Sequence, residues 1–130
     1  MLIYKQELPM DTLFPQKVRL PFTSVHNAIK AVMKLDLQYD VPVMWYQADY
    51  EKYDTVQSLT EKDWTEDFQG KEFWLLAIGT GHDWKDGLKL DNYIGTVQLY
   101  SGTLVLHYFI VDWSDKFDDA EDGNGENEDA

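Results

Sequence analysis

The sequence predicts a mainly β protein, built as a small antiparallel β-sandwich or partly open barrel. Its 130 residues have the length of one domain, which is enough for a core of its own. Aromatic residues make up 15% of the chain and supply bulky apolar surface for that core. Short β-rich runs separated by Pro, Gly and polar turns outnumber the helical patterns, as in antiparallel β folds. We expect one domain at residues 1–113 and an acidic tail at residues 114–130.

The first two strands are expected at residues 2–8 and 16–20. The first run is a short mixed segment that ends at Pro9, and the second alternates between Pro15 and Pro21. Because proline cannot donate a ladder hydrogen bond, these prolines place the second strand near a sheet edge.

Residues 24–38 fit two patterns. As a helix, the segment begins at a Ser24 cap and gathers apolar side chains on one face. As a strand, residues 29–37 alternate apolar and polar side chains, the period of a half-buried strand. The alternation is cleaner, so we expect a strand over residues 29–37 with a helical turn near Ser24. The helical alternative places on one face Val25, Ile29, Val32 and Met33.

Two further strands are expected in the middle of the chain. Residues 42–48 are β-rich and begin at a proline, which a strand tolerates at its first position. We expect this strand inside a sheet. Residues 71–79 are nearly all apolar after Glu72, which is typical of a strand covered on both faces.

The strongest local signal is a hairpin formed by residues 92–100 and 103–113. Only Ser101 and Gly102 separate these runs, which suits a two-residue loop with a positive φ at Gly102. His107 is expected to lie in the core as a histidine whose hydrogen bonds are satisfied. Alternation gives the second strand two faces, one with Leu104, Leu106, Tyr108 and Ile110, the other with Val105, His107, Phe109 and Val111.

Residues 49–70 form a polar, acidic insertion between two apolar strands. We expect a loop or a short surface helix that begins near Thr60. Its acids, with aromatic side chains as anchors, are the candidate contacts for a protein partner. These candidates are Asp49, Tyr50, Glu51, Tyr53, Asp54, Glu61, Asp63, Trp64, Glu66 and Asp67.

The charge of the chain is strongly negative and uneven. Eleven Lys and Arg against 24 Asp and Glu give a net charge of −13, which argues against direct binding to nucleic acid and favours a basic protein partner. Residues 114–130 hold eight acids and one base, too polar to fold alone. We expect a disordered tail that attracts a basic partner, or else a solubilising terminus. The tail's candidate residues are Asp118, Asp119, Glu121 and Asp122.

No sequence pattern points to a catalytic, metal or cofactor site. The GTGHDW string at residues 79–84 lacks the spacing of a phosphate loop, so Gly79, Gly81 and His82 are interpreted as a strand end and turn. A His82–Asp83 general base is disfavoured because neighbours on a strand point to opposite faces. We therefore expect no enzyme, no cofactor and no metal. A metal site would need His82, Asp83, Asp86 and His107, which lack a typical ligand spacing.

The chain has no Cys and no apolar run of membrane-spanning length. Residues 1–9 lack a charged segment followed by a long apolar run, so we expect no signal peptide. We expect no membrane association, and a cytoplasmic location.

Several strings resemble a family of short bacteriophage proteins to which no activity is attached. MLIYKQELP is similar to its opening IYKYPL strand, PVMWYQAD to its LWALVD strand, and GTGH to its turn. YIGT followed by GTLVLHYF resembles its closing YIGT and GxLVFHVF. The resemblance covers most of residues 1–113, is strongest over residues 78–109, and excludes the tail. It implies a small antiparallel β protein and supports a strand at residues 29–37.

The long insertion and the acidic tail depart from that family pattern. Together with the charge, the resemblance leads us to expect a phage-encoded acidic binding protein in the host cytoplasm. It would engage and inhibit a host nucleic-acid-handling or defence enzyme through a negative surface, in the manner of a DNA mimic. We expect a monomer or small homo-oligomer. The alternative is an assembly or structural accessory of the virion, which a ring or higher oligomer would favour.

Overall fold

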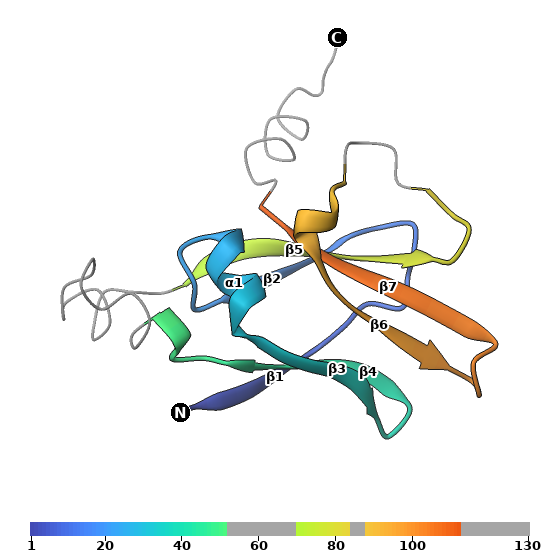
Figure 1. Ribbon diagram of the computed structural model, residues 1–130, viewed down its shortest axis with the longest axis horizontal. Helices are drawn as coiled ribbons and strands as arrows, with labels where there is room; N and C mark the ends of the chain where they lie inside the picture. Colours follow the sequence, from blue (N-terminus) through green and yellow to red (C-terminus); the bar gives the residue numbers. More distant parts are fainter. Residues whose placement is uncertain (52–69, 84–87, 113–130) are drawn as a thin grey trace, which may run out of the picture.

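The computed structural model describes residues 1–51, 70–83 and 88–112 as two antiparallel sheets and one short helix (Figure 1). The first sheet has the order β1–β4–β3 and the second β2–β5–β7–β6. The predicted mainly β, antiparallel architecture is confirmed, and the two sheets do not close into a barrel. The strands are β1 (Ile3–Glu7), β2 (Gln16–Leu20), β3 (Val32–Gln38), β4 (Val41–Gln47), β5 (Lys71–Gly79), β6 (Tyr93–Leu99) and β7 (Leu104–Val111).

The positions of the strands within the sheets follow the sequence pattern. β2 lies at an edge and β4 lies between two strands, as expected. β5 is buried on both faces, because Phe73 and Leu75 enter the main core while Trp74 and Leu76 pack on the opposite face. A continuous apolar run is therefore explained by burial on two sides.

The expected strand over residues 29–37 is wrong at its start. Residues 25–31 form α1 (Val25–Ala31), and β3 begins only at Val32. Ser24 caps the helix by accepting a hydrogen bond from the Asn27 amide at 3.2 Å, as the helical alternative proposed. The helical conformation is favoured because it buries Ala28 and Ala31, which are 1% and 2% exposed. Among the described residues, no helix is long and apolar enough to cross a membrane.

A bulge also changes which residues of β3 face the core. The register shifts between Val32 and Lys34, so Val32 packs against the core while Met33 is 51% exposed. Beyond the bulge, Leu35 and Leu37 pack inward as the alternation predicted.

Two tight hairpins shape the ends of the sheets. Tyr39 and Asp40 join β3 to β4, both with positive φ, as a two-residue loop with primed turn geometry requires. The β6–β7 loop is four residues long (100–103) rather than the expected two, because Leu99 pairs with Leu104. Gly102 has the positive φ expected of it, +88°.

The main core lies between the sheets, and one phenol spans it. Tyr108 on β7 is fully buried, and its hydroxyl donates a 2.8 Å hydrogen bond to the Pro9 carbonyl, at the end of the other sheet's first strand. Burial raises the pKa of Tyr108. A single side chain thus ties the centre of one sheet to the loop that leaves the other.

The sheets approach most closely where β3 meets β6. A Cβ placed on Gly95 would lie 2.9 Å from Cδ2 of Leu35, and the φ of Gly95 is +154°. Glycine is therefore favoured there, because an alanine would adopt a strained φ and would need the Leu35 side chain to move. The bulge between Tyr93 and Gly95 produces this conformation.

We predict that Gly95→Ala lowers the free energy of unfolding by about 1 to 3 kcal/mol, because it adds backbone strain and overpacking. Gly81→Ala is the matched control, since Gly81 has a φ of +87° with open space around it and reports strain alone. Chemical denaturation measures both. A Gly95→Ala/Leu35→Ala double variant should cost less than the sum of its single changes, and strict additivity would contradict the contact.

We predict that stability falls as pH rises above about 10, where tyrosines of the unfolded chain ionise. Burial raises the pKa of Tyr108, so the folded chain keeps this phenol protonated at a pH at which the unfolded chain loses the proton. The rising pH therefore favours the unfolded state. Denaturation of the wild type and Tyr108→Phe across alkaline pH measures this. Tyr108→Phe should lose about 1 kcal/mol at neutral pH with the hydrogen bond and decline less steeply above pH 10. An equally steep decline would refute the role of Tyr108.

Candidate functional site

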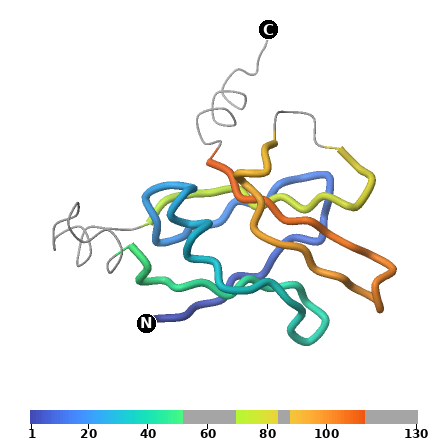
Figure 2. Tube along the Cα trace, in the orientation of Figure 1, coloured from blue at the N-terminus to red at the C-terminus, as the bar shows by residue number. Residues whose placement is uncertain are grey.

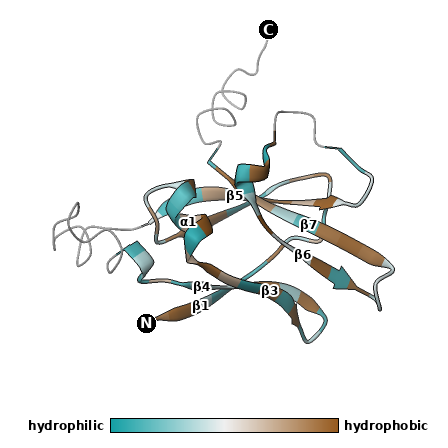
Figure 3. Ribbon diagram, in the orientation of Figure 1, coloured by the Kyte–Doolittle hydropathy of each residue, from teal (hydrophilic) through white to brown (hydrophobic). Residues whose placement is uncertain are grey.

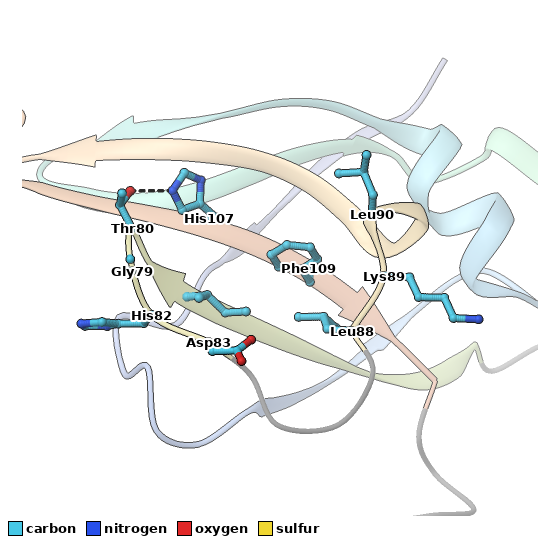
Figure 4. Close-up of a pocket in the computed structure, with 11 residues that line it drawn as sticks. Gly79, Thr80, His82, Asp83, Leu88, Lys89, Leu90, His107 and Phe109 are labelled. Atoms are coloured by element: carbon cyan, nitrogen blue, oxygen red, sulfur yellow. Dashed lines mark hydrogen bonds between the residues drawn. The ribbon is translucent and has the colours of Figure 1, made fainter.

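A hollow of about 360 Å³ lies on the face of the second sheet that points away from the main core (Figure 4). Ile78, Leu88 and Phe109 give it apolar walls. Thr80 and His107 bring polar groups to it, from the end of β5 and the middle of β7. The hollow thus gathers the GTGH turn and His107, two features that the sequence singled out separately.

His107 has both ring nitrogens engaged. The Thr80 hydroxyl lies 2.7 Å from its Nε2, and the Thr96 hydroxyl lies 2.9 Å from its Nδ1. The Thr96 hydroxyl is in turn hydrogen-bonded to the Tyr93 phenol. The expected satisfied histidine is present, but its predicted place in the core is wrong. It is half-buried on the outer face beside Phe109. Its hydrogen bonds connect the middle of β7 to the middle of β6 and to the residue that follows β5.

Of the GTGH side chains, that of Thr80 reaches His107 and that of His82 does not. The turn is closed by the His82 backbone N–H, which donates to the Gly79 carbonyl at 3.1 Å, so these residues form the expected strand end and turn. Figure 4 shows the His82 imidazole directed away from that of His107. Within the described residues, no three His, Cys, Asp or Glu side chains gather as metal ligands; Asp86 lies outside them.

Glu51, at the start of the insertion, is a buried structural carboxylate and not the exposed partner contact we expected. Its side chain is 1% exposed. Oε1 accepts from the Thr23 amide at 2.5 Å, and Oε2 accepts from the Thr23 hydroxyl at 2.6 Å and the Asn27 amide group at 3.1 Å. These bonds fasten the chain after β4 to the start of α1.

Asp49 and Tyr50 are also engaged by the fold. Asp49 accepts a 3.0 Å hydrogen bond from the Leu2 amide, which lowers the pKa of its carboxyl, and Tyr50 packs against the core. The other proposed contacts of the insertion, and the tail residues, lie outside the described residues. These are Tyr53, Asp54, Glu61, Asp63, Trp64, Glu66 and Asp67 in the insertion, and Asp118, Asp119, Glu121 and Asp122 in the tail.

The described body carries little of the net charge. It contains ten acids and seven bases, a net of −3, whereas the whole chain has −13. Residues 52–69 hold five acids and two bases, and residues 113–130 hold eight acids and one base. Three of the ten acids of the described body pair with side-chain cations: Glu72 with Lys17 and Arg19, Asp36 with Lys34, and Asp112 with Lys71.

The two acid-rich segments are attached to the body at neighbouring points. Antiparallel pairing of β5 with β7 sets Trp74 opposite Val111, and the Lys71 ammonium lies 2.5 Å from the Asp112 carboxylate. In Figure 2 the trace of β7 ends near the first half of β5. Lys71, which follows the insertion, and Asp112, which precedes the tail, therefore lie side by side. Sequence reasoning missed this proximity because it depends on the pairing of two strands distant in the chain.

Comparison with protein-family models, with curated proteins and with solved structures finds no match to this chain. The resemblance to bacteriophage proteins therefore stays a prediction, and a functional argument depends on the chain's own residues.

We predict that Glu51→Ala lowers the free energy of unfolding by about 3 kcal/mol, because three donors lose a shared acceptor in a buried place. Glu51→Gln keeps one acceptor oxygen and should cost less. Asp83→Ala, which removes an exposed carboxylate, should stay within about 0.5 kcal/mol of the wild type. Chemical denaturation measures these free energies of unfolding. An equal effect of Glu51→Ala and Asp83→Ala would show that the hydrogen bonds of Glu51 do not stabilise the fold.

Proposed function

We propose that this chain is a phage-encoded acidic binding protein that acts in the host cytoplasm. Its partner is a host protein with a basic groove built for nucleic acid, such as a nucleic-acid-handling or defence enzyme, and binding inhibits that enzyme. The proposal is supported above all by the adjacency of Lys71 and Asp112, which brings the attachment points of two acid-rich segments together.

The adjacency supports the proposal because Lys71 follows one acid-rich segment and Asp112 precedes the other, so chain connectivity keeps the nearest acids of both close to the same ion pair. Residues 52–69 and 113–130 carry net charges of −3 and −7. Separately attached segments would spread this charge around the body, whereas neighbouring attachments give one strongly negative region. Such a region attracts and orients a basic groove, and raises the association rate most at low salt.

The location of the charge also changes the form of mimicry we propose. A rigid DNA mimic needs free carboxylates on an ordered surface, but in the described body the strand carboxylates of Glu72 and Asp112 are paired with cations and Glu51 is buried. The negative region is therefore assigned to the insertion after Glu51 and to the tail, with the β body as their support.

A host-lysate capture at two salt concentrations tests the proposal. The immobilised full chain should retain a nucleic-acid-binding enzyme at low salt, release it at higher salt, and release it to added duplex DNA, because the groove is shared. The purified enzyme should then lose activity when the chain is added. A captured protein that DNA does not displace, or an enzyme that stays active, would refute the proposal.

We predict that deletion of residues 114–130 leaves the melting temperature nearly unchanged but slows association with the captured partner about tenfold or more at low salt. Stability depends on buried apolar area and encounter rate depends on charge, and the tail has eight acids but one aromatic residue, Phe117. Thermal melting and association rates at two ionic strengths measure both effects.

An internal control removes charge without shortening the chain. Neutralising the insertion by Asp63→Asn, Glu66→Gln and Asp67→Asn should slow association less than the tail deletion, since it removes three charges of the −13. An unchanged association rate in both variants would show that the acids do not steer the partner.

A further inference from the structure

Among the described residues, no strand pairs with the outer edge of β1 in the first sheet. β1 hydrogen-bonds to β4 on one side and ends the sheet order on the other. Along this strand Ile3, Tyr4, Lys5 and Glu7 are all exposed, and Figure 3 shows the strand's first residues in the hydrophobic colour. An exposed edge of this kind is a template for a further strand.

The pairing with β4 determines which backbone groups are available. The Ala48 amide donates to the Leu2 carbonyl and the Leu8 amide donates to the Pro42 carbonyl, so the even-numbered residues of β1 form the hydrogen-bonded pairs. Because these pairs alternate along an antiparallel ladder, the N–H and C=O groups of Ile3, Lys5 and Glu7 point away from β4. Pro9, which has no N–H, ends this row of donors.

The order of side chains favours one self-pairing register. A two-fold antiparallel pair must match outward-pointing residues with each other, so its centre lies at Tyr4, Lys5 or Gln6. A centre at Lys5 would set the two Lys5 side chains opposite each other, and a centre at Tyr4 would set Lys5 opposite Ile3. A centre at Gln6 sets each Lys5 opposite the other copy's Glu7, so both copies gain an opposite-charge cross-strand pair.

The register centred at Gln6 gives partners to exposed charged and apolar side chains at this edge. Within residues 1–51, 70–83 and 88–112, neither Lys5 nor Glu7 forms an ion pair, and the Lys5 ammonium contacts only a neutral amide, that of Gln38. The same register brings Leu2, 47% exposed, toward the other copy's Met10, 42% exposed. The same register therefore produces both the charged pairs and the apolar contact.

We propose that the β1 edge is an interface with a second copy of this chain, in which two β1 strands pair antiparallel about Gln6 and join two three-stranded sheets into one. The low charge of the body makes this contact feasible. Its net charge is −3, and at physiological ionic strength charges more than about 8 Å apart are largely screened. The interface is independent of the acidic segments and of any host partner.

Sedimentation equilibrium of the purified full chain at physiological ionic strength, over a wide concentration range, tests the proposal. The wild type should show a monomer–dimer equilibrium. Lys5→Glu and Glu7→Lys should each weaken dimerisation about tenfold, because two symmetry-related attractions become repulsions. The double variant Lys5→Glu/Glu7→Lys should return to within about threefold of the wild type, since it restores both pairs.

Lys34→Glu is the matched control, because it makes the same charge change on β3 of the same sheet and away from the β1 edge. It should leave the dimer unchanged, and melting curves confirm that each variant folds. If Lys5→Glu unfolds, Glu7→Lys tests the same pairs. Amide exchange should protect Lys5 and Glu7 only at concentrations where the dimer forms. A monomer at all concentrations, a dimer insensitive to both reversals, or ladder amides that stay unprotected would each overturn the proposal.

Discussion

The pairing of β5 with β7 is the constraint on which the rest of the structure depends. It fixes the register from Trp74 opposite Val111 to Gly79 opposite Leu106, at the centre of the larger sheet. Because side chains alternate along both strands, this one register sends Phe73 and Tyr108 into the main core. The same register sends the opposite set of side chains outward, where His107 lies at the hollow.

The two ends of the same ladder have different consequences. At one end the turn after Gly79 carries Thr80 to His107, so the outer-face hydrogen bonds exist only in this register. At the other end Lys71 meets Asp112, so two acid-rich segments are attached side by side. A shift by one residue would exchange the faces of β5 and would separate both arrangements together. Core packing and the placement of charge are thus not independent features of this chain.

Local patterns predicted the strands well, because alternation and breakers act within a few residues. The division of the β7 side chains into two faces was correct, but the face with His107 and Phe109 was expected to point inward and lies outside the main core, which receives Tyr108. The predictions that failed depend on contacts between residues far apart in the sequence. Ile29 satisfies the helical and the strand period equally, and the choice depends on the burial of Ala28 by other elements. Glu51 looks like any acid of the insertion, and only its contact with Thr23, 28 residues earlier, gives it a structural role.

Gly95 shows why some residues needed for the fold had no signal. In the sequence it is one glycine within a β-rich run, where glycine usually weakens a strand. Its role appears only when the two sheets meet and Leu35 occupies the space of a Cβ. The hollow near His107 was likewise unpredictable as a unit, because Thr80 and Thr96 lie 27 and 11 residues away from it in the chain.

The separation of charge from the folded body has a physical rationale that connects its stability with its proposed binding. A compact body carrying −13 would be destabilised by self-repulsion, whereas this body holds −3 and pairs several of its carboxylates with cations such as Lys71. Its cohesion therefore depends on apolar burial and hydrogen bonds, which salt screens little. The rest of the negative charge belongs to residues 52–69 and 113–130, and the long-range attraction that such charge would exert on a basic surface is strongly screened by salt. Changes of ionic strength should consequently act on association and leave the folding equilibrium nearly untouched, a decoupling that a uniformly charged surface of the same composition could not provide.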